Sequence, residues 1–197
     1  MATLQPKFIV GIGGSAGSLN AFKALLKALS PRTSMAFIFV SHIYPTANSQ
    51  LAQILARHTK MPVMLAENEM VIQRNSVYVI PPDSDLFVEN YILKVISPRS
   101  VRNKQVDILF SSLADAVGSS AIGVVFSGYD VDGTEGCQRI KNKGGTIFAQ
   151  DKSAEVDSMP QSAIAAGHVD FVMAPEKIAV EILRMGTNPY KKIRKKV

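Results

Sequence analysis

The hydrophobic positions of the chain alternate between short continuous runs and stretches with helical spacing. The first run, residues 8–17 (FIVGIGGSAG), is almost uninterrupted and ends at glycines, which predicts a buried strand followed by a tight turn. Apolar residues at helical spacing then predict a helix over residues 18–29. Ser15 therefore lies in the turn, at the carboxyl end of the strand and before the N-terminus of a helix. The segment Gly13–Gly17 has the spacing G-x-S-x-G of a nucleophile elbow.

The same alternation continues to the C-terminus and predicts a doubly wound α/β domain. Residues 76–97 differ, because they alternate with period two and contain two turn signals, so we expect a small antiparallel hairpin region there. The expected strands are residues 36–40, a short strand near 62–64, 121–128, 144–151 and 168–173. The expected helices are residues 49–59, 106–117, a stretch from 133 through 140, a short helix opening at Met159-Pro160, and 175–185.

Length and charge favour one domain with a short tail. A chain of 197 residues can bury one sizeable core, and we place the domain at residues 1–187 and a basic tail at 188–197. Five basic residues of the tail supply most of the formal charge of +6, so the body is close to neutral. We therefore expect no nucleic-acid partner, and we interpret the tail as a solubilising terminus rather than a contact for an acidic partner or a membrane surface.

Cysteine and histidine usage limits the chemistry further. The single cysteine, Cys137, excludes an internal disulfide framework and suits a reducing compartment. The N-terminus lacks the features of a signal peptide, and no segment has the length of apolar sequence that crosses a bilayer. We therefore expect a cytoplasmic protein without membrane insertion. No histidine or cysteine pair has metal-ligand spacing, so we expect no metal, and we also expect no cofactor.

Three side chains of the serine-hydrolase type follow three of the predicted strands. Ser15 ends the first strand, His42 follows the second, and Asp132 lies in the loop after residues 121–126. Parallel strands carry such loops to one edge of the sheet, so the three side chains are expected to meet. A serine hydroxyl needs a base to become nucleophilic, and the base needs a carboxylate to hold its tautomer. Asp130 competes with Asp132 for the carboxylate role.

Several other interpretations stay open on spacing alone. Residues 11–16 also fit the dinucleotide fingerprint G-x-G-x-x-A, although no acidic residue follows the second strand to hold a ribose. A P-loop is excluded, because no Gly-Lys-Ser/Thr follows the glycines. Ser15 could serve only as a helix N-cap, and Asp132-Gly133 only as a turn. His58 and His168 are expected away from this edge of the sheet, and Cys137 is expected in the core.

Six motifs in order resemble the catalytic domain of chemotaxis protein-glutamate methylesterases of the CheB type, from about Phe8 to Leu183. They are Gly13–Ser18, Ser41-His42-Ile43-Tyr44-Pro45, Val79–Asp83, Val106–Phe110, Ser127–Gly133, and Ala149-Gln150-Asp151 with Met159-Pro160 and Ala163-Ile164. The resemblance implies a mostly parallel sheet of about seven strands. It also implies a serine esterase that hydrolyses γ-glutamyl methyl esters, and deamidates glutamines, in methylated chemoreceptors or related sensory proteins.

The resemblance assigns a role to each candidate residue by motif position. It makes Ser15 the nucleophile, His42 the base and Asp132, rather than Asp130, the orienting carboxylate. The backbone N–H groups of Ala16 and Tyr129 fall where the family binds the oxyanion of the tetrahedral intermediate.

The chain also departs from the family pattern. Ala16 and Ser18 replace threonine and glycine, and Gly-Tyr-Asp replaces Gly-Met-Gly at residues 128–130. Asp85 stands where many relatives carry histidine, and Lys104-Gln105 stand where they carry Pro-Ser. We expect no N-terminal receiver domain, since the catalytic strand begins within the first ten residues. These departures support one alternative, a non-catalytic module of the same fold that binds a receptor or sensor.

Overall fold

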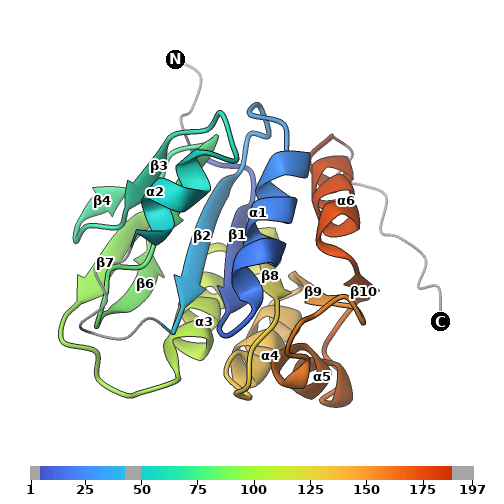
Figure 1. Ribbon diagram of the computed structural model, residues 1–197. Coiled ribbons are helices and arrows are strands. Elements are labelled where there is room, and N and C mark those ends of the chain that lie inside the picture. Colours follow the sequence, from blue (N-terminus) through green and yellow to red (C-terminus); the bar gives the residue numbers. More distant parts are fainter. Residues whose placement is uncertain (1–4, 43–49, 188–197) are drawn as a thin grey trace.

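A seven-stranded sheet forms the centre of the computed structural model, which describes residues 5–42 and 50–187 (Figure 1). Its strands run in the order β10-β9-β8-β1-β2-β5-β3, and every pair of neighbours is parallel. Their bounds are β1 Ile9–Gly14, β2 Ala36–Ser41, β3 Val63–Leu65, β5 Ser76–Val79, β8 Ala121–Val125, β9 Thr146–Gln150 and β10 Phe171–Met173. The predicted parallel α/β sheet is confirmed.

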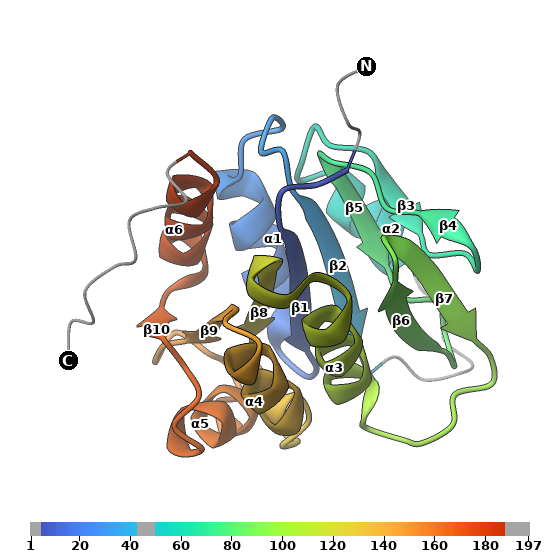
Figure 2. The ribbon, with the colours of Figure 1, turned by 180° about the vertical axis from the view of Figure 1, so that it is seen from behind.

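Helices cover both faces of this sheet, as a doubly wound fold requires. One face carries α1 (Ser18–Ala28), α2 (Leu51–Ala56) and α6 (Pro175–Thr187), which lie in front in Figure 1. The other face carries α3 (Gln105–Val117) and α4 (Thr134–Asn142), with α5 (Ser158–Ala165) beside α4 (Figure 2). A short 3₁₀ helix, Gly118–Ser120, links α3 to β8. Two buried clusters of apolar side chains fill the two interfaces between sheet and helices.

The glycines of the first strand allow helices to pack closely on both faces. A Cβ atom on Gly13 would lie 2.4 Å from Val106 Cγ1 of α3, and one on Gly14 would lie 2.6 Å from Ser18 Cβ of α1. The strand therefore continues through Gly14, and the turn is shorter than the predicted segment 13–17. In this position the glycines serve helix-to-strand packing.

The segment 76–97 differs in part from its prediction. Ser76–Val79 is not part of a hairpin, because it forms β5 of the parallel sheet, between β2 and β3, where all four of its residues are buried. Only the second half forms the expected antiparallel hairpin, β6 (Asp85–Glu89) and β7 (Ile92–Ile96), and it pairs with β4 (Met70–Val71), which was not predicted. The alternation over residues 76–97 indicates strands but does not show which sheet each strand joins, which explains the error.

The topology brings three loops to one edge of the sheet. β1 lies between β8 and β2, so the segments that follow these three strands are neighbours at their carboxyl ends. The predicted tail 188–197, and residues 43–45 of the second motif, lie outside the described residues. In the two described ranges, no helix combines the length and the apolar character needed to cross a membrane.

Candidate active site

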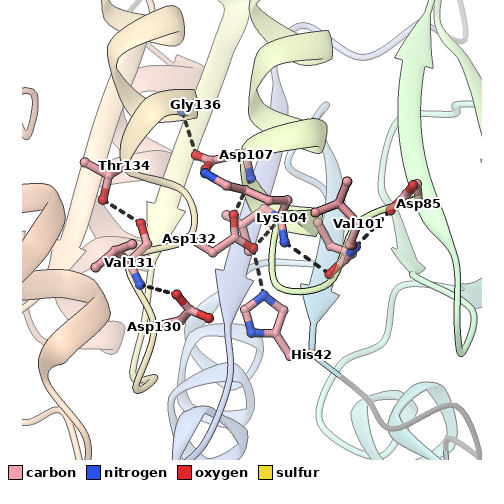
Figure 3. A network of polar contacts seen from close by, with 12 residues as sticks. His42, Asp85, Val101, Lys104, Asp107, Asp130, Val131, Asp132, Thr134 and Gly136 are labelled. Carbon is pink, nitrogen blue, oxygen red and sulfur yellow. Dashed lines mark hydrogen bonds and ion pairs between the residues drawn. The ribbon is translucent and has the colours of Figure 1, made fainter. Parts of the chain in front are cut away.

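His42 and Asp132 meet at this edge of the sheet. His42 directly follows β2, and its Nε2 lies 2.7 Å from Oδ2 of Asp132, which comes from the loop between β8 and α4 (Figure 3). The His42 side chain is 8% exposed and that of Asp132 is 0% exposed. Because Nε2 faces the carboxylate, Nδ1 is the ring nitrogen without a hydrogen-bond partner among the described residues.

The Asp132 carboxylate also accepts two backbone hydrogen bonds from the first turn of α3. The N–H of Val106 donates to Oδ2 and the N–H of Asp107 donates to Oδ1, both at 2.9 Å. Burial alone raises the pKa of Asp132, but the hydrogen bonds from His42, Val106 and Asp107 outweigh it and hold the pKa below its ordinary value. Asp132 is therefore ionised beside the imidazole at neutral pH.

Asp107 behaves in the opposite way. Its Oδ1 accepts the N–H of Gly136 in the first turn of α4, at 2.8 Å, and its Oδ2 accepts a hydrogen bond from Lys104 Nζ at 3.0 Å. Burial nevertheless raises the pKa of Asp107, with a further contribution from the charge of Asp132, and these two donors do not offset it. Asp132, in the loop before α4, thus caps the N-terminus of α3, and Asp107, in the first turn of α3, caps the N-terminus of α4.

Ser15 lies in the turn between β1 and α1 and is held through its backbone. Its N–H donates to Ser127 O at 2.8 Å, and its carbonyl accepts the Ser18 hydroxyl at 2.7 Å. The N-cap of α1 is Gly17, at φ 75°, without a side-chain cap, so the N-cap interpretation of Ser15 is wrong. Within the described chain the Ser15 hydroxyl has no hydrogen-bond partner, and none joins it to His42.

The two backbone groups expected to bind an oxyanion have N–H groups without acceptors. Neither Ala16 N nor Tyr129 N donates a hydrogen bond inside residues 5–42 and 50–187. Ser127 holds the turn on both sides of Ala16, since its carbonyl accepts the N–H of Ser15 at 2.8 Å and its hydroxyl donates to Ala16 O at 2.8 Å and accepts the N–H of Val156. A small change at Ser127 would therefore be transmitted to the turn that carries Ser15.

An open cavity of about 920 Å³ contains these groups. Asp130 lines it, and its carboxylate accepts the N–H of Val131 at 2.7 Å, whereas His42 contacts Asp132. His58 and His168 are not among its lining residues. Burial raises the pKa of the Cys137 thiol in α4, consistent with its predicted place in the core. The lining residues are Ser15, Ala16, Ser41, His42, Arg99, Arg102, Asn103, Tyr129 and Asp130.

Sequence reasoning missed the wall formed by Arg99, Arg102 and Asn103 in the segment that leads into α3. This segment is anchored by Asp85 of β6, a carboxylate with 0% exposure. Asp85 accepts hydrogen bonds from Ser100 N at 2.7 Å and from Gln105 Nε2 at 2.8 Å, and also from the Ser100 hydroxyl. Asp85 and Gln105 both depart from the family pattern, and the structure shows that they contact each other. The signal in the sequence is that both positions depart in the same chain.

Comparisons with known proteins give one consistent result. The family model described as CheB methylesterase matches residues 10–182. A Leptospira interrogans serovar copenhageni protein, provisionally named as a protein-glutamate methylesterase/protein-glutamine glutaminase, is 32% identical over 181 residues, or 90% of this chain and 94% of that protein. A Saccharophagus degradans protein named protein-glutamate methylesterase/protein-glutamine glutaminase 2 is 29% identical, over 92% of this chain and 54% of that protein.

A solved structure is similar as well. The crystal structure of the Thermotoga maritima CheB methylesterase catalytic domain superposes with a TM-score of 0.83 at 28% identity. The match covers 90% of this chain and 98% of that domain. The likeness therefore extends over most of this chain.

Proposed function

This chain belongs to the CheB methylesterase family, which makes it a carboxylic ester hydrolase, and we propose that it removes methyl groups from γ-glutamyl methyl esters of chemoreceptor-type proteins. We assign Ser15 as the nucleophile, His42 as the base and Asp132 as the carboxylate that orients the base. The observation that carries this proposal is the 2.7 Å contact of His42 Nε2 with the buried Asp132, beside a cavity that both His42 and Ser15 line.

Acylation follows from the protonation states of these groups. With Nε2–H donating to the Asp132 carboxylate, His42 Nδ1 is an unprotonated acceptor for the Ser15 hydroxyl proton. Ser15 Oγ attacks the ester carbonyl carbon, and the N–H groups of Ala16 and Tyr129 stabilise the oxyanion, each at about 3 kcal/mol. Collapse of the intermediate breaks the bond to the methoxide, which takes the proton from His42 and leaves as methanol.

Deacylation uses the same groups in reverse. His42 removes a proton from a water molecule, the resulting hydroxide attacks the acyl-enzyme, and Ser15 leaves with the proton as the free glutamate is released. The ionised Asp132 stabilises the imidazolium in both halves of the reaction, which is consistent with its lowered pKa. A glutamine side chain can follow the same route, with ammonia as the leaving group in place of methanol.

Methanol release tests the proposal. Purified protein is incubated with a receptor fragment carrying radiolabelled glutamyl methyl esters, and volatile methanol is counted for the wild type and Ser15→Ala. We expect Ser15→Ala to lose at least about 10³-fold in kcat, because the attacking atom is gone. Ser119→Ala is a matched control, since Ser119 is exposed on the 3₁₀ helix that precedes β8, at the opposite end of that strand.

Two results would contradict the proposal. Full activity of Ser15→Ala would remove the serine from the mechanism. Folded wild-type protein that binds the receptor fragment but releases no methanol would favour the interaction module instead.

A further inference from the structure

The walls of the cavity carry charges that the proposed reaction does not use. Arg99 and Arg102 lie on the segment before α3, and Asp130 lies on the loop after β8. In Figure 3, Asp130 lies on one side of His42, and Val101, on the segment before α3, lies on the other. A methylated glutamyl side chain has no charge, so these groups are available to contact other parts of a bound polypeptide.

Only one of the two arginines is neutralised by the protein. Arg99 Nε lies 3.3 Å from Asp83 Oδ1, and the Arg99 side chain is only 11% exposed. Arg102 is exposed, and no carboxylate in residues 5–42 or 50–187 forms an ion pair with it. Lys104, the next cation along the segment, is paired with Asp107 at 3.0 Å and with Glu135 at 3.4 Å. Of these three cations, Arg102 is therefore the one without an ion-pair partner among the described residues.

The backbone on both sides of Arg102 is fixed. Ser100 is bound to the buried Asp85 through its N–H, and Gln105 Nε2 donates both to Asp85 and to Val101 O, the latter at 2.6 Å. Asn103 has φ 54°, which turns the chain between these two anchors. A side chain on an anchored backbone loses less freedom when it binds a partner than one on a long loop.

The opposite wall has the complementary charge. The Asp130 carboxylate accepts only the N–H of the next residue, and no cation forms an ion pair with it in the described part of the chain. An acidic side chain placed against Asp130 would be repelled, whereas the same side chain placed against Arg102 would be bound. The segment before α3 and the loop after β8 therefore present opposite charges to the cavity.

We infer that Arg102 determines specificity by binding the carboxylate of an acidic residue that flanks the methylated glutamate on one side, while Asp130 disfavours an acidic residue on the other side. The inference rests on the proposed function and specifies its substrate class: a polypeptide segment whose acidic neighbour lies on the Arg102 side of the ester. Guanidinium and carboxylate are suited to such a pair, because the two planar groups can form two parallel hydrogen bonds.

Three peptides test the inference through hydrolysis. Each contains one glutamyl methyl ester, with a glutamate on its N-terminal side, a glutamate on its C-terminal side, or glutamine at both positions. We expect one acidic peptide to exceed the neutral peptide in kcat/KM by about fivefold at low salt, and high salt to reduce this ratio. Arg102→Gln abolishes the preference, and Asp130→Asn raises kcat/KM for the other acidic peptide.

Arg32→Gln is the matched control for charge. Arg32 is exposed and precedes β2, so it lies at the opposite end of that strand from His42. We expect this variant to keep the wild-type preference. An equal loss of preference in Arg32→Gln, or an equal ratio in wild type and Arg102→Gln, would overturn the inference.

Binding separates this inference from the proposed reaction. Ser15→Ala, with and without Arg102→Gln, is titrated with the same three fluorescent peptides, and the dissociation constants are measured by anisotropy. If no peptide is hydrolysed by the wild type but one acidic peptide still binds about fivefold more tightly in an Arg102-dependent way, the proposed reaction fails and the binding of an acidic residue by Arg102 is supported. Equal affinity for all three peptides contradicts the inference whatever the hydrolysis assay gives.

Discussion

Two buried carboxylates hold the N-terminus of α3 from opposite sides, and they differ in what else they contact. Asp132 is buried, accepts hydrogen bonds from the N–H groups of Val106 and Asp107, and also contacts His42. Asp85, 0% exposed, accepts a hydrogen bond from the side chain of Gln105 and also contacts Ser100. Both appear in Figure 3, on either side of the first turn of the helix. Burial alone therefore does not identify the carboxylate of an active site.

The difference lies in the second contact of each carboxylate. Asp132 holds a titratable ring in the cavity, so its charge can act on a proton transfer. Asp85 holds a segment of backbone, so its charge acts on the position of Arg102. The same helix end thus supports the proposed chemistry on one side and the proposed specificity on the other.

The largest difference between the two carboxylates is expected in kcat when each is converted to its amide. Asp132→Asn places an NH₂ group where His42 needs an acceptor, which favours the wrong tautomer, and we expect kcat for a small neutral methyl ester to fall by about 10³- to 10⁴-fold. Asp85→Asn makes the same chemical change at the other side of the helix and should keep kcat within about tenfold. Equal losses of kcat in the two variants would mean that the two carboxylates do not differ in function.

A smaller effect is expected on stability at the Asp85 side. Asp85→Ala removes the acceptor of Gln105 Nε2, Ser100 N and the Ser100 hydroxyl, which we expect to lower the free energy of unfolding by about 1–3 kcal/mol. Urea denaturation of Asp85→Ala, Gln105→Ala and the double variant measures the coupling between the two side chains, expected at about 1 kcal/mol. Additive losses would indicate that the two residues act independently despite their 2.8 Å contact.

The pH dependence of stability gives the next effect, and its sign follows from the lowered pKa of Asp132. A carboxyl whose pKa is lower in the folded state contributes its full stabilisation above the ordinary value of 3.8 and loses it as the pH falls through the folded value. The difference in unfolding free energy between wild type and Asp132→Asn should therefore shrink in acid. Urea unfolding between about pH 2 and 7 measures it, and a difference that grows in acid would contradict the assignment.

Asp107 is expected to show the smallest effect, with the opposite sign. Because its pKa is raised, its contribution is fully present below 3.8 and is lost as the pH rises through the folded value. The stability difference between wild type and Asp107→Asn should fall with rising pH over the same titration series. Parallel slopes for the Asp107 and Asp132 variants would show that the two carboxylates share one environment.

The sequence predicted the parts of this arrangement that depend on strand ends. Ser15, His42 and Asp132 each follow a buried strand, and a parallel sheet carries such residues to one edge whatever their separation in sequence. It assigned Ser76–Val79 to the antiparallel hairpin region instead of the parallel sheet, because alternation marks a strand but does not show which sheet the strand joins. Arg102 and the contact of Asp85 with Gln105 depend on the path of an irregular segment, which periodicity does not describe.

Covalent labelling of Ser15 tests the central claim most directly, namely that His42 and Asp132 activate this serine. The folded protein is treated with a fluorophosphonate, and the modified peptide and its rate of formation are determined by mass spectrometry. We expect one adduct, on Ser15, that forms at similar rates in wild type and Asp85→Asn and far more slowly in Asp132→Asn. Absence of an adduct on Ser15 in the folded wild type, or an equal rate in Asp132→Asn, would contradict the account.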